Sequence, residues 1–216
     1  MTPFQRCEGV VVPLDRLNVD TDQIIPARFL TSISRSGFGP NLFYGWRYLP
    51  AGPGGAAPVP NPDFELNEER FAGAPILLTR RNFGCGSSRE HAVWALQQQG
   101  FRVVIAPTFG DIFYQNSLKN GFLPVVLPEE AVDELFQAAR KANALQLVVD
   151  LETQTVSAPS AGLRYSFEID GFSRDCLLRG LDDVALTLTE ADAIRAFETR
   201  HLAAYPWLAR DLNATT

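Results

Sequence analysis

Apolar runs alternate with helical stretches along residues 75–142, and this alternation is the feature that most restricts the fold. Apolar runs at 75–78, 102–106 and 123–127 are typical of buried strands, and a stretch with helical character follows each. The clearest helix is 129–142, where apolar residues recur at the i, i+3, i+4, i+7 spacing: Val132, Leu135, Phe136 and Ala139. Strands joined by crossover helices pair in parallel. The sequence therefore predicts an α/β fold with a parallel sheet.

Further β-type runs flank this unit. A short apolar run at 9–12 precedes it, and runs at 147–156 and 163–169 follow it with turn signals between them, including Asp170-Gly171. The later runs predict strands that pair antiparallel, as a second or mixed β layer with flanking helices. A last helix is expected from Thr189, where Thr-Glu-Ala-Asp has the spacing of a cap.

The length of 216 residues suits a single domain spanning 1–216. Residues 51–62 are rich in glycine and proline and predict a surface loop, whereas 211–216 predict a frayed tail. Hydrophobic residues make up 46% and charged residues 20%, as in soluble globular proteins. No run approaches the ~18 apolar residues of a membrane span, and residues 1–9 do not resemble a secretory signal. The expected location is cytoplasmic.

Charge and cysteine content argue against two classes of function. The formal net charge of −6 and the pI near 5.0 argue against nucleic acid as a general partner. Cys7, Cys85 and Cys176 are scattered, with no Cys-x-x-Cys pair, and only two histidines are present. Iron–sulfur and zinc sites usually need clustered ligands. We therefore expect this chain to bind no metal or cofactor itself.

Residues 81–91, Arg-Asn-Phe-Gly-Cys-Gly-Ser-Ser-Arg-Glu-His, join a predicted strand to a predicted helix. The two glycines permit a tight turn, and Ser87 with Glu90 has capping-box spacing. A helix N-terminus favours anions, and Arg89 adds a planar donor suited to a carboxylate or phosphate. The stretch fits either a simple helix cap or an anion-binding, catalytic turn. The clustering of glycine, serine and arginine favours the second interpretation.

Two other polar features are more ambiguous. Asp20 and Asp22 precede an apolar stretch and could hold a hard cation, although helix caps and Asx turns explain such pairs more often. Arg35 lies in a glycine-containing loop among apolar residues, where a lone arginine is usually just solvated.

Four segments together resemble the small subunit of 3-isopropylmalate dehydratase, a relative of aconitase: residues 18–29, 82–91, 105–113 and 180–183. The resemblance covers nearly the whole chain and implies a swivelling β/β/α three-layer domain. It also implies a separate large subunit with a 4Fe–4S cluster, one iron of which binds the substrate's hydroxyl and a carboxylate. It further implies that the isolated chain is inactive.

The family reaction dehydrates 2-isopropylmalate and rehydrates the enoic diacid at the neighbouring carbon, in leucine biosynthesis. By the family motif the base is Ser87, acting as an alkoxide. The same resemblance assigns substrate binding to five residues: Thr21, Asp22, Arg35, Ser88 and Arg89. Apolar Leu30 and Ile33 are expected to line the pocket for the isopropyl group, and His91 is expected to be structural.

Three alternatives remain open. The chain could be the small subunit of a related hydro-lyase, of the homoaconitase or methylmalate type. It could be a stand-alone anion- or nucleotide-binding module, although it lacks a Walker lysine or a ribose-binding acid at the usual offset. A purely structural interaction domain would leave the serine–arginine cluster unexplained.

Overall fold

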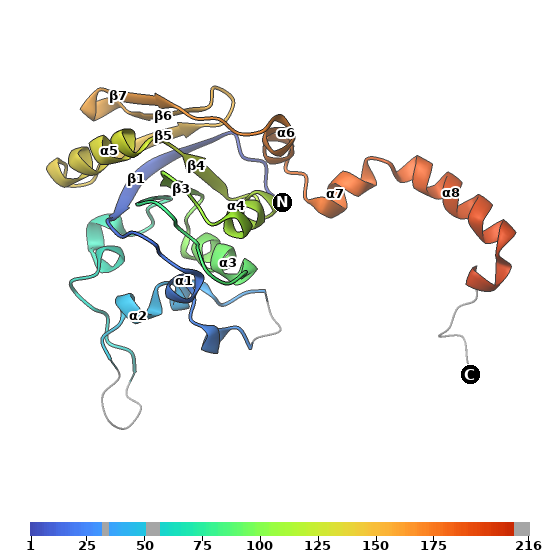
Figure 1. The fold of residues 1–216 in the computed structure, drawn as a ribbon, viewed down its shortest axis with the longest axis horizontal. Helices are drawn as coiled ribbons and strands as arrows, with labels where there is room; N and C mark the ends of the chain where they lie inside the picture. The colour runs from blue at the N-terminus through green and yellow to red at the C-terminus, as the bar shows by residue number, and fades with distance from the viewer. Residues whose placement is uncertain (32–34, 51–56, 210–216) are drawn as a thin grey trace.

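The structure is a computed structural model that describes residues 1–31, 35–50 and 57–209 (Figure 1). Its centre is a seven-stranded sheet of order β4-β3-β2-β1-β5-β6-β7. The strands are β1 (Arg6–Leu14), β2 (Ile76–Thr79), β3 (Val103–Ala106), β4 (Leu123–Val126), β5 (Gln146–Asp150), β6 (Thr155–Ala158) and β7 (Leu163–Ser166).

Strand β1 divides the sheet into a parallel and an antiparallel half. It pairs in parallel with β2, and β2, β3 and β4 continue that half. On its other side it pairs antiparallel with β5, which β6 and β7 follow. The predicted α/β fold with parallel and antiparallel strands is confirmed. Residues 147–156, however, were expected as one β-type run and instead form a hairpin of two strands, β5 and β6. The chain reverses in the turn at 151–154, where Gln154 has a φ of +52°.

The α-helices are α1 (Thr21–Ile24), α2 (Tyr44–Arg47), α3 (Glu90–Gln99), α4 (Asp111–Lys119), α5 (Glu129–Lys141), α6 (Gly171–Arg179), α7 (Asp183–Leu188) and α8 (Ala191–Ala204). Short 3₁₀ segments occur at Ala27–Phe29, Gly39–Asn41, Glu65–Asn67, Glu69–Phe71, Pro159–Ala161 and Pro206–Ala209. In the part of the chain that the structure describes, no helix is long and apolar enough to cross a membrane.

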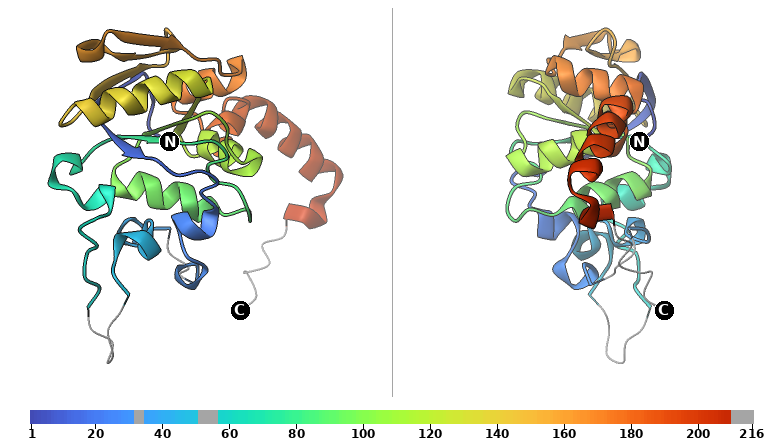
Figure 2. Two further views of the ribbon diagram at one scale, coloured as in Figure 1. Left: turned by 60° about the vertical axis from the view of Figure 1, so that its left-hand side comes forward. Right: turned by 90° about the vertical axis from the view of Figure 1, so that its right-hand side faces the viewer.

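Helices cover both faces of the parallel strands (Figures 1 and 2), and a hydrophobic core lies on each face. Along β1, successive side chains point to opposite faces, so Val11 belongs to one core and Val12 to the other. The first core lies between α5, the parallel strands and β5–β6, and it buries all four predicted apolar positions of α5. The second packs α3 and the loops before β2 against the sheet, burying Val93 and Leu96 as predicted.

The C-terminal region differs from the prediction. Asp170 does not mark a simple turn but caps α6, accepting a hydrogen bond from the Ser173 amide at 2.9 Å. The last helix begins at Ala191 rather than Thr189, because Thr189 ends α7 and its hydroxyl donates back to the Leu186 carbonyl at 2.7 Å. Residues 51–56 of the expected surface loop and all of the expected tail lie outside the described residues.

Candidate active site

The turn between β2 and α3 depends on two glycines. Gly84 has a φ of +72° and Gly86 a φ of +87°, a region that side chains rarely adopt. A Cβ at Gly84 would lie 2.3 Å from Cγ of Phe113, which is buried. A Cβ at Gly110, at the start of α4, would lie 2.5 Å from the Gly84 carbonyl oxygen. The backbones of the two turns therefore approach more closely than side chains would allow.

Two segments distant in the sequence hold the turn, one at residues 19–21 and the other at Thr108. The Gly84 amide donates to the Val19 carbonyl at 2.7 Å, and the Thr21 amide donates to the Cys85 carbonyl at 3.0 Å. On the other side, the Phe83 amide donates to the Thr108 carbonyl at 3.1 Å. The buried Thr21 hydroxyl donates to the Ser87 carbonyl at 2.7 Å. Thr21 thereby fixes the backbone of the proposed base.

The predicted capping box at Ser87 is wrong. Helix α3 begins at Glu90 with Arg89 at the N-cap, and no side chain caps it. Residues 87–89 belong to the turn and not to the helix, so Ser87 lies too far from the first amides of α3 to cap them. The Glu90 carboxylate, which a capping box would direct back to Ser87, instead accepts a hydrogen bond from Asn120 Nδ2 at 2.8 Å. Among the described residues, the Ser87 and Ser88 hydroxyls have no hydrogen-bond partner.

The turn also presents backbone donors. Within the described part of the chain, the amides of residues 86–89 donate no hydrogen bond to backbone or side chain. Ser87 and Ser88 are exposed. Exposed amides, two hydroxyls and the positive end of α3 form a surface that favours a carboxylate or phosphate. This geometry fits the anion-binding interpretation better than the simple helix cap.

Arg89 and Asp22 form a two-point ion pair beside the turn. The guanidinium contacts both carboxylate oxygens, with Nη2 to Oδ2 at 2.8 Å, and Nη1 also donates to the Ile25 carbonyl at 3.3 Å. The Arg89 side chain is 14% exposed and that of Asp22 is 55% exposed. The hydrogen bond from Arg89 lowers the pKa of Asp22 below its usual range. Asp22 thus orients Arg89.

The neighbouring Asp20 has a structural role. Its carboxylate accepts from the Gln23 amide at 2.7 Å, and its own amide donates to Gln23 Oε1 at 2.9 Å, which completes a capping box on α1. The helix-cap interpretation of Asp20 is confirmed. Burial raises the pKa of the Cys85 thiol, with a further contribution from the Asp20 charge. Among the described residues, no group of three or more Asp, Glu, His or Cys side chains is placed to hold a metal ion.

The turn opens into a hollow of about 220 Å³. Its lining is Thr21, Gly84, Cys85, Gly86, Ser87, Arg89, Gly110, Asp111, Ile112 and Phe113. It lies where β2 and β3 end, the edge at which open α/β sheets bind ligands. Ile112 is 51% exposed and was not predicted as a site residue. Its position in the first turn of α4, the helix that follows the parallel strand β3, could have indicated it.

Neither Arg35 nor Leu30, two other predicted site residues, lines this hollow. The Arg35 guanidinium lies 5.4 Å from the centroid of the Trp94 ring, and the Arg35 carbonyl accepts from Gln98. Leu30 is half-buried against the second core. Ile33 lies outside the described residues. His91 packs edge-on against Phe38 at 5.1 Å, in keeping with a structural role.

The fold and the turn are those of an α/β domain that presents a polar turn at the carboxyl ends of its parallel strands. The family model of the aconitase C-terminal domain matches residues 1–130, which is more than half of the chain, and the chain belongs to this family. The LeuD_N model matches residues 133–171. The model of the C-terminal domain of the 3-isopropylmalate dehydratase small subunit matches residues 183–211.

A solved structure has the same fold. The chain is similar to a 3-isopropylmalate dehydratase (leuD) from Methanocaldococcus jannaschii, with a TM-score of 0.63 and 22% sequence identity. The match covers 89% of this chain and 99% of the chain in that structure.

Proposed function

We propose that this chain is the small subunit of a cytoplasmic 3-isopropylmalate dehydratase. This hydro-lyase isomerises 2-isopropylmalate to 3-isopropylmalate through isopropylmaleate, in leucine biosynthesis, and is active only with its large subunit. The family models support the assignment. The observation that carries the chemistry is the turn at 84–89, where the serine hydroxyls and the amides of residues 86–89 have no partner among the described residues and lie beside a partly buried arginine.

The reaction removes a proton from the carbon next to a carboxylate. We assign this step to Ser87 as an alkoxide that acts as general base and later returns the proton. A serine hydroxyl is a very weak acid, so its ionised form needs stabilisation. We assign this stabilisation to the amides of residues 86–89, the positive end of α3 and the Arg89 guanidinium. Thr21 keeps the Ser87 backbone in place through its hydrogen bond.

Substrate carboxylate binding falls to Ser88 and Arg89 in this scheme. Arg89 is already oriented by Asp22, whose bidentate contact fixes the plane of the guanidinium. A substrate carboxylate in the hollow would therefore bind a guanidinium that is already held in one orientation. Arg35 and Leu30 lie on the segment before α2, and neither lines the hollow. Their proposed contacts with substrate would require this segment to face the shared site in the assembled enzyme.

The 4Fe–4S cluster is proposed to reside in the large subunit. The donor set agrees with this assignment, because Cys85 lies in the turn itself, Cys7 is buried in β1 and Cys176 lies on α6. When present, the cluster supplies a Lewis acid that helps the hydroxyl group leave. The small subunit supplies the base, the hydrogen-bond donors that bind the substrate carboxylate, and the surface that excludes water.

The test is hydration of isopropylmaleate by the purified chain, alone and mixed with a cluster-loaded large subunit. Activity should appear only in the mixture, and Ser87→Ala should abolish it without preventing assembly. Ser166→Ala, at an exposed serine on the distant strand β7, is the matched control and should retain activity. A fully active, assembled Ser87→Ala complex would refute the base assignment.

Substrate profiling separates this proposal from a related hydro-lyase. Replacing Leu30 with arginine should depress activity on isopropylmalate more than on a diacid that carries a further carboxylate, because the apolar contact becomes cationic. Leu49→Arg, a substitution at an exposed leucine elsewhere on the chain, is the control for added charge. An unchanged profile for Leu30→Arg would remove Leu30 from the specificity pocket. A wild-type complex that is inert on isopropylmaleate would favour the related diacid enzymes.

A further inference from the structure

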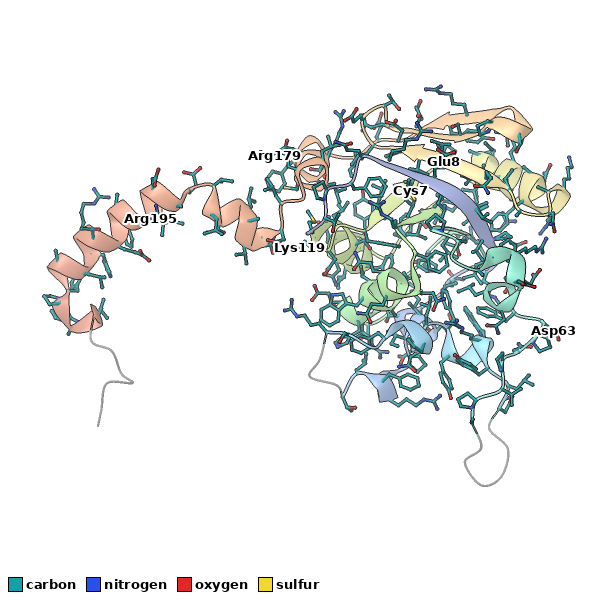
Figure 3. All side chains as sticks on the ribbon, turned by 180° about the vertical axis from the view of Figure 1, so that it is seen from behind. Cys7, Glu8, Asp63, Lys119, Arg179 and Arg195 are labelled. Carbon is teal, nitrogen blue, oxygen red and sulfur yellow. The ribbon has the colours of Figure 1, made fainter. Side chains whose placement is uncertain are left out.

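Residues 183–209 form a C-terminal arm, made of α7, α8 and the 3₁₀ segment Pro206–Ala209, that extends away from the body of the molecule (Figures 1 and 3). None of the 14 residues of α8 is buried. In Figure 3 the labelled Arg195 stands on the arm, while Lys119 and Arg179 lie on the body near its root. The arm therefore gains almost no stability from packing on its own chain.

One side of the arm carries an aromatic stripe. Ile194, Phe197, His201 and Tyr205 fall on one side at helical spacing. The Phe197 and His201 rings stack at 5.1 Å, His201 and Tyr205 lie 4.8 Å apart, and Tyr205 and Trp207 lie 5.4 Å apart. Phe197 is 56% exposed and Trp207 68% exposed. Isolated helices of this length are marginal in water, so such a stripe requires a surface to cover it.

A second hollow joins the root of the arm to the start of α3, the helix that follows the candidate catalytic turn. This hollow, of about 400 Å³, is lined by Arg35 and Glu90 together with Asp182, Asp183 and Val184 of the root. Glu90 directly follows Arg89 in the chain, at the start of α3. The terminal amine of Met1 pairs with Asp182 at 2.9 Å and so fixes the root to the body. A partner that covers the turn can therefore continue over this hollow onto the arm.

We propose that the aromatic stripe of the arm docks into an apolar groove on the large subunit, an inference that rests on the proposed function. Two observations select this occupant over a second copy of the chain. The arm root shares a hollow with Glu90, which directly follows Arg89 of the turn that the large subunit would cover in the proposed function. The arm also coincides with residues 183–211, the stretch matched by the model of the small subunit's own C-terminal domain, which ties it to the dehydratase assembly.

The charge distribution predicts how the contact behaves. Asp192 and Arg195 pair with each other at 3.2 Å on the other side of α8, and the charges nearest the stripe are Glu198 and Arg200, which flank it with opposite signs. Apolar and aromatic burial then dominates docking, as in helix-in-groove recognition. Affinity should vary little with salt, because the contact contains few unscreened charges.

The experiment measures the Kd between the full chain and the cluster-loaded large subunit by calorimetry, together with hydration of isopropylmaleate. Phe197→Ala and Trp207→Ala should each weaken binding by about 30-fold, the size of an aromatic hot spot. Arg195→Ala, on the polar side, is the matched control and should bind like the unaltered chain. Because the arm packs so little on the body, the thermal midpoint of each variant should stay unchanged. At saturating large subunit the arm variants should recover activity, whereas Ser87→Ala should not.

Equal binding by the aromatic variants and the unaltered chain, in an active complex, would overturn the docking proposal and leave the proposed function standing. A self-associating chain that becomes monomeric in the aromatic variants, with unchanged affinity for the large subunit, would overturn it in favour of a second copy. An assembled complex that contains the unaltered chain and is inert would count against the proposed function. Docking would still be supported if the aromatic variants failed to assemble.

Discussion

Replacing Gly84 with alanine is the sharpest test of how the turn between β2 and α3 is built, and Gly86→Ala is its internal control. Both residues have positive φ values, so each substitution should incur the left-handed backbone penalty of about 1–2 kcal/mol. Only Gly84 adds a steric conflict, since its Cβ would lie 2.3 Å from Phe113 Cγ, whereas a Cβ at Gly86 would lie 3.4 Å from its nearest neighbour, Asp20 Cβ.

Phe113 cannot easily relieve that conflict. Its ring is buried, and the centroid of the ring lies 5.3 Å from that of Phe83 and 6.2 Å from that of Phe109. Forcing a methyl group into such packing costs about 1–3 kcal/mol. Gly84→Ala should therefore lower the free energy of unfolding by about 2–5 kcal/mol in total, and Gly86→Ala by only about 1–2 kcal/mol.

Urea denaturation of the two variants and the unaltered chain measures both values, with the m-value checked for two-state behaviour. The difference between the variants isolates the Phe113 contact, because the backbone penalty and the effect of alanine on the unfolded chain are common to both. Equal losses, or a loss at Gly84 within about 0.5 kcal/mol of zero, would refute the close approach of the turn to α4.

Two further predictions concern carboxylates that pair with arginine. Asp22→Asn should change stability by less than about 0.5 kcal/mol, because Asp22 is largely exposed, yet should lower kcat/KM for isopropylmaleate about tenfold by releasing Arg89. Unchanged kcat/KM in the assembled enzyme would contradict the positioning role. Asp15 contacts Arg80 and Arg140, and its hydrogen bond with Arg80 is the main cause of its lowered pKa in the folded protein. The ionised Asp15 therefore stabilises the fold at pH values above its unfolded-state pKa of about 4. That stabilisation is lost as the pH falls through the lower pKa that Asp15 has in the folded protein. Asp15→Asn should therefore lower the free energy of unfolding by about 1 kcal/mol near pH 7 and by much less near pH 2, as measured by urea denaturation. An equal loss of stability at both pH values would exclude the ion pair as the cause.

The parts of the fold that were predicted are those in which local pattern and tertiary burial agree. The helix at 129–142 was recognisable because Val132, Leu135 and Phe136 form one apolar face, and the structure buries that face. The helix at 171–179 gave no such signal, since Leu177 is its only buried residue. The hairpin of β5 and β6 was missed because its reversal has few turn residues and needs a positive φ at Gln154, which the sequence pattern does not reveal.

The candidate site divides in the same way. The sequence by itself determined that residues 81–91 form a glycine turn with two serines and an arginine before a helix, because residue type and spacing are local properties. Tertiary structure decided that Ser87 does not cap that helix, that Thr21 holds its carbonyl and that Asp22 orients Arg89. These contacts join residues more than 60 positions apart. They exist only because β1 and β2 pair in parallel and bring their carboxyl ends to one edge of the sheet.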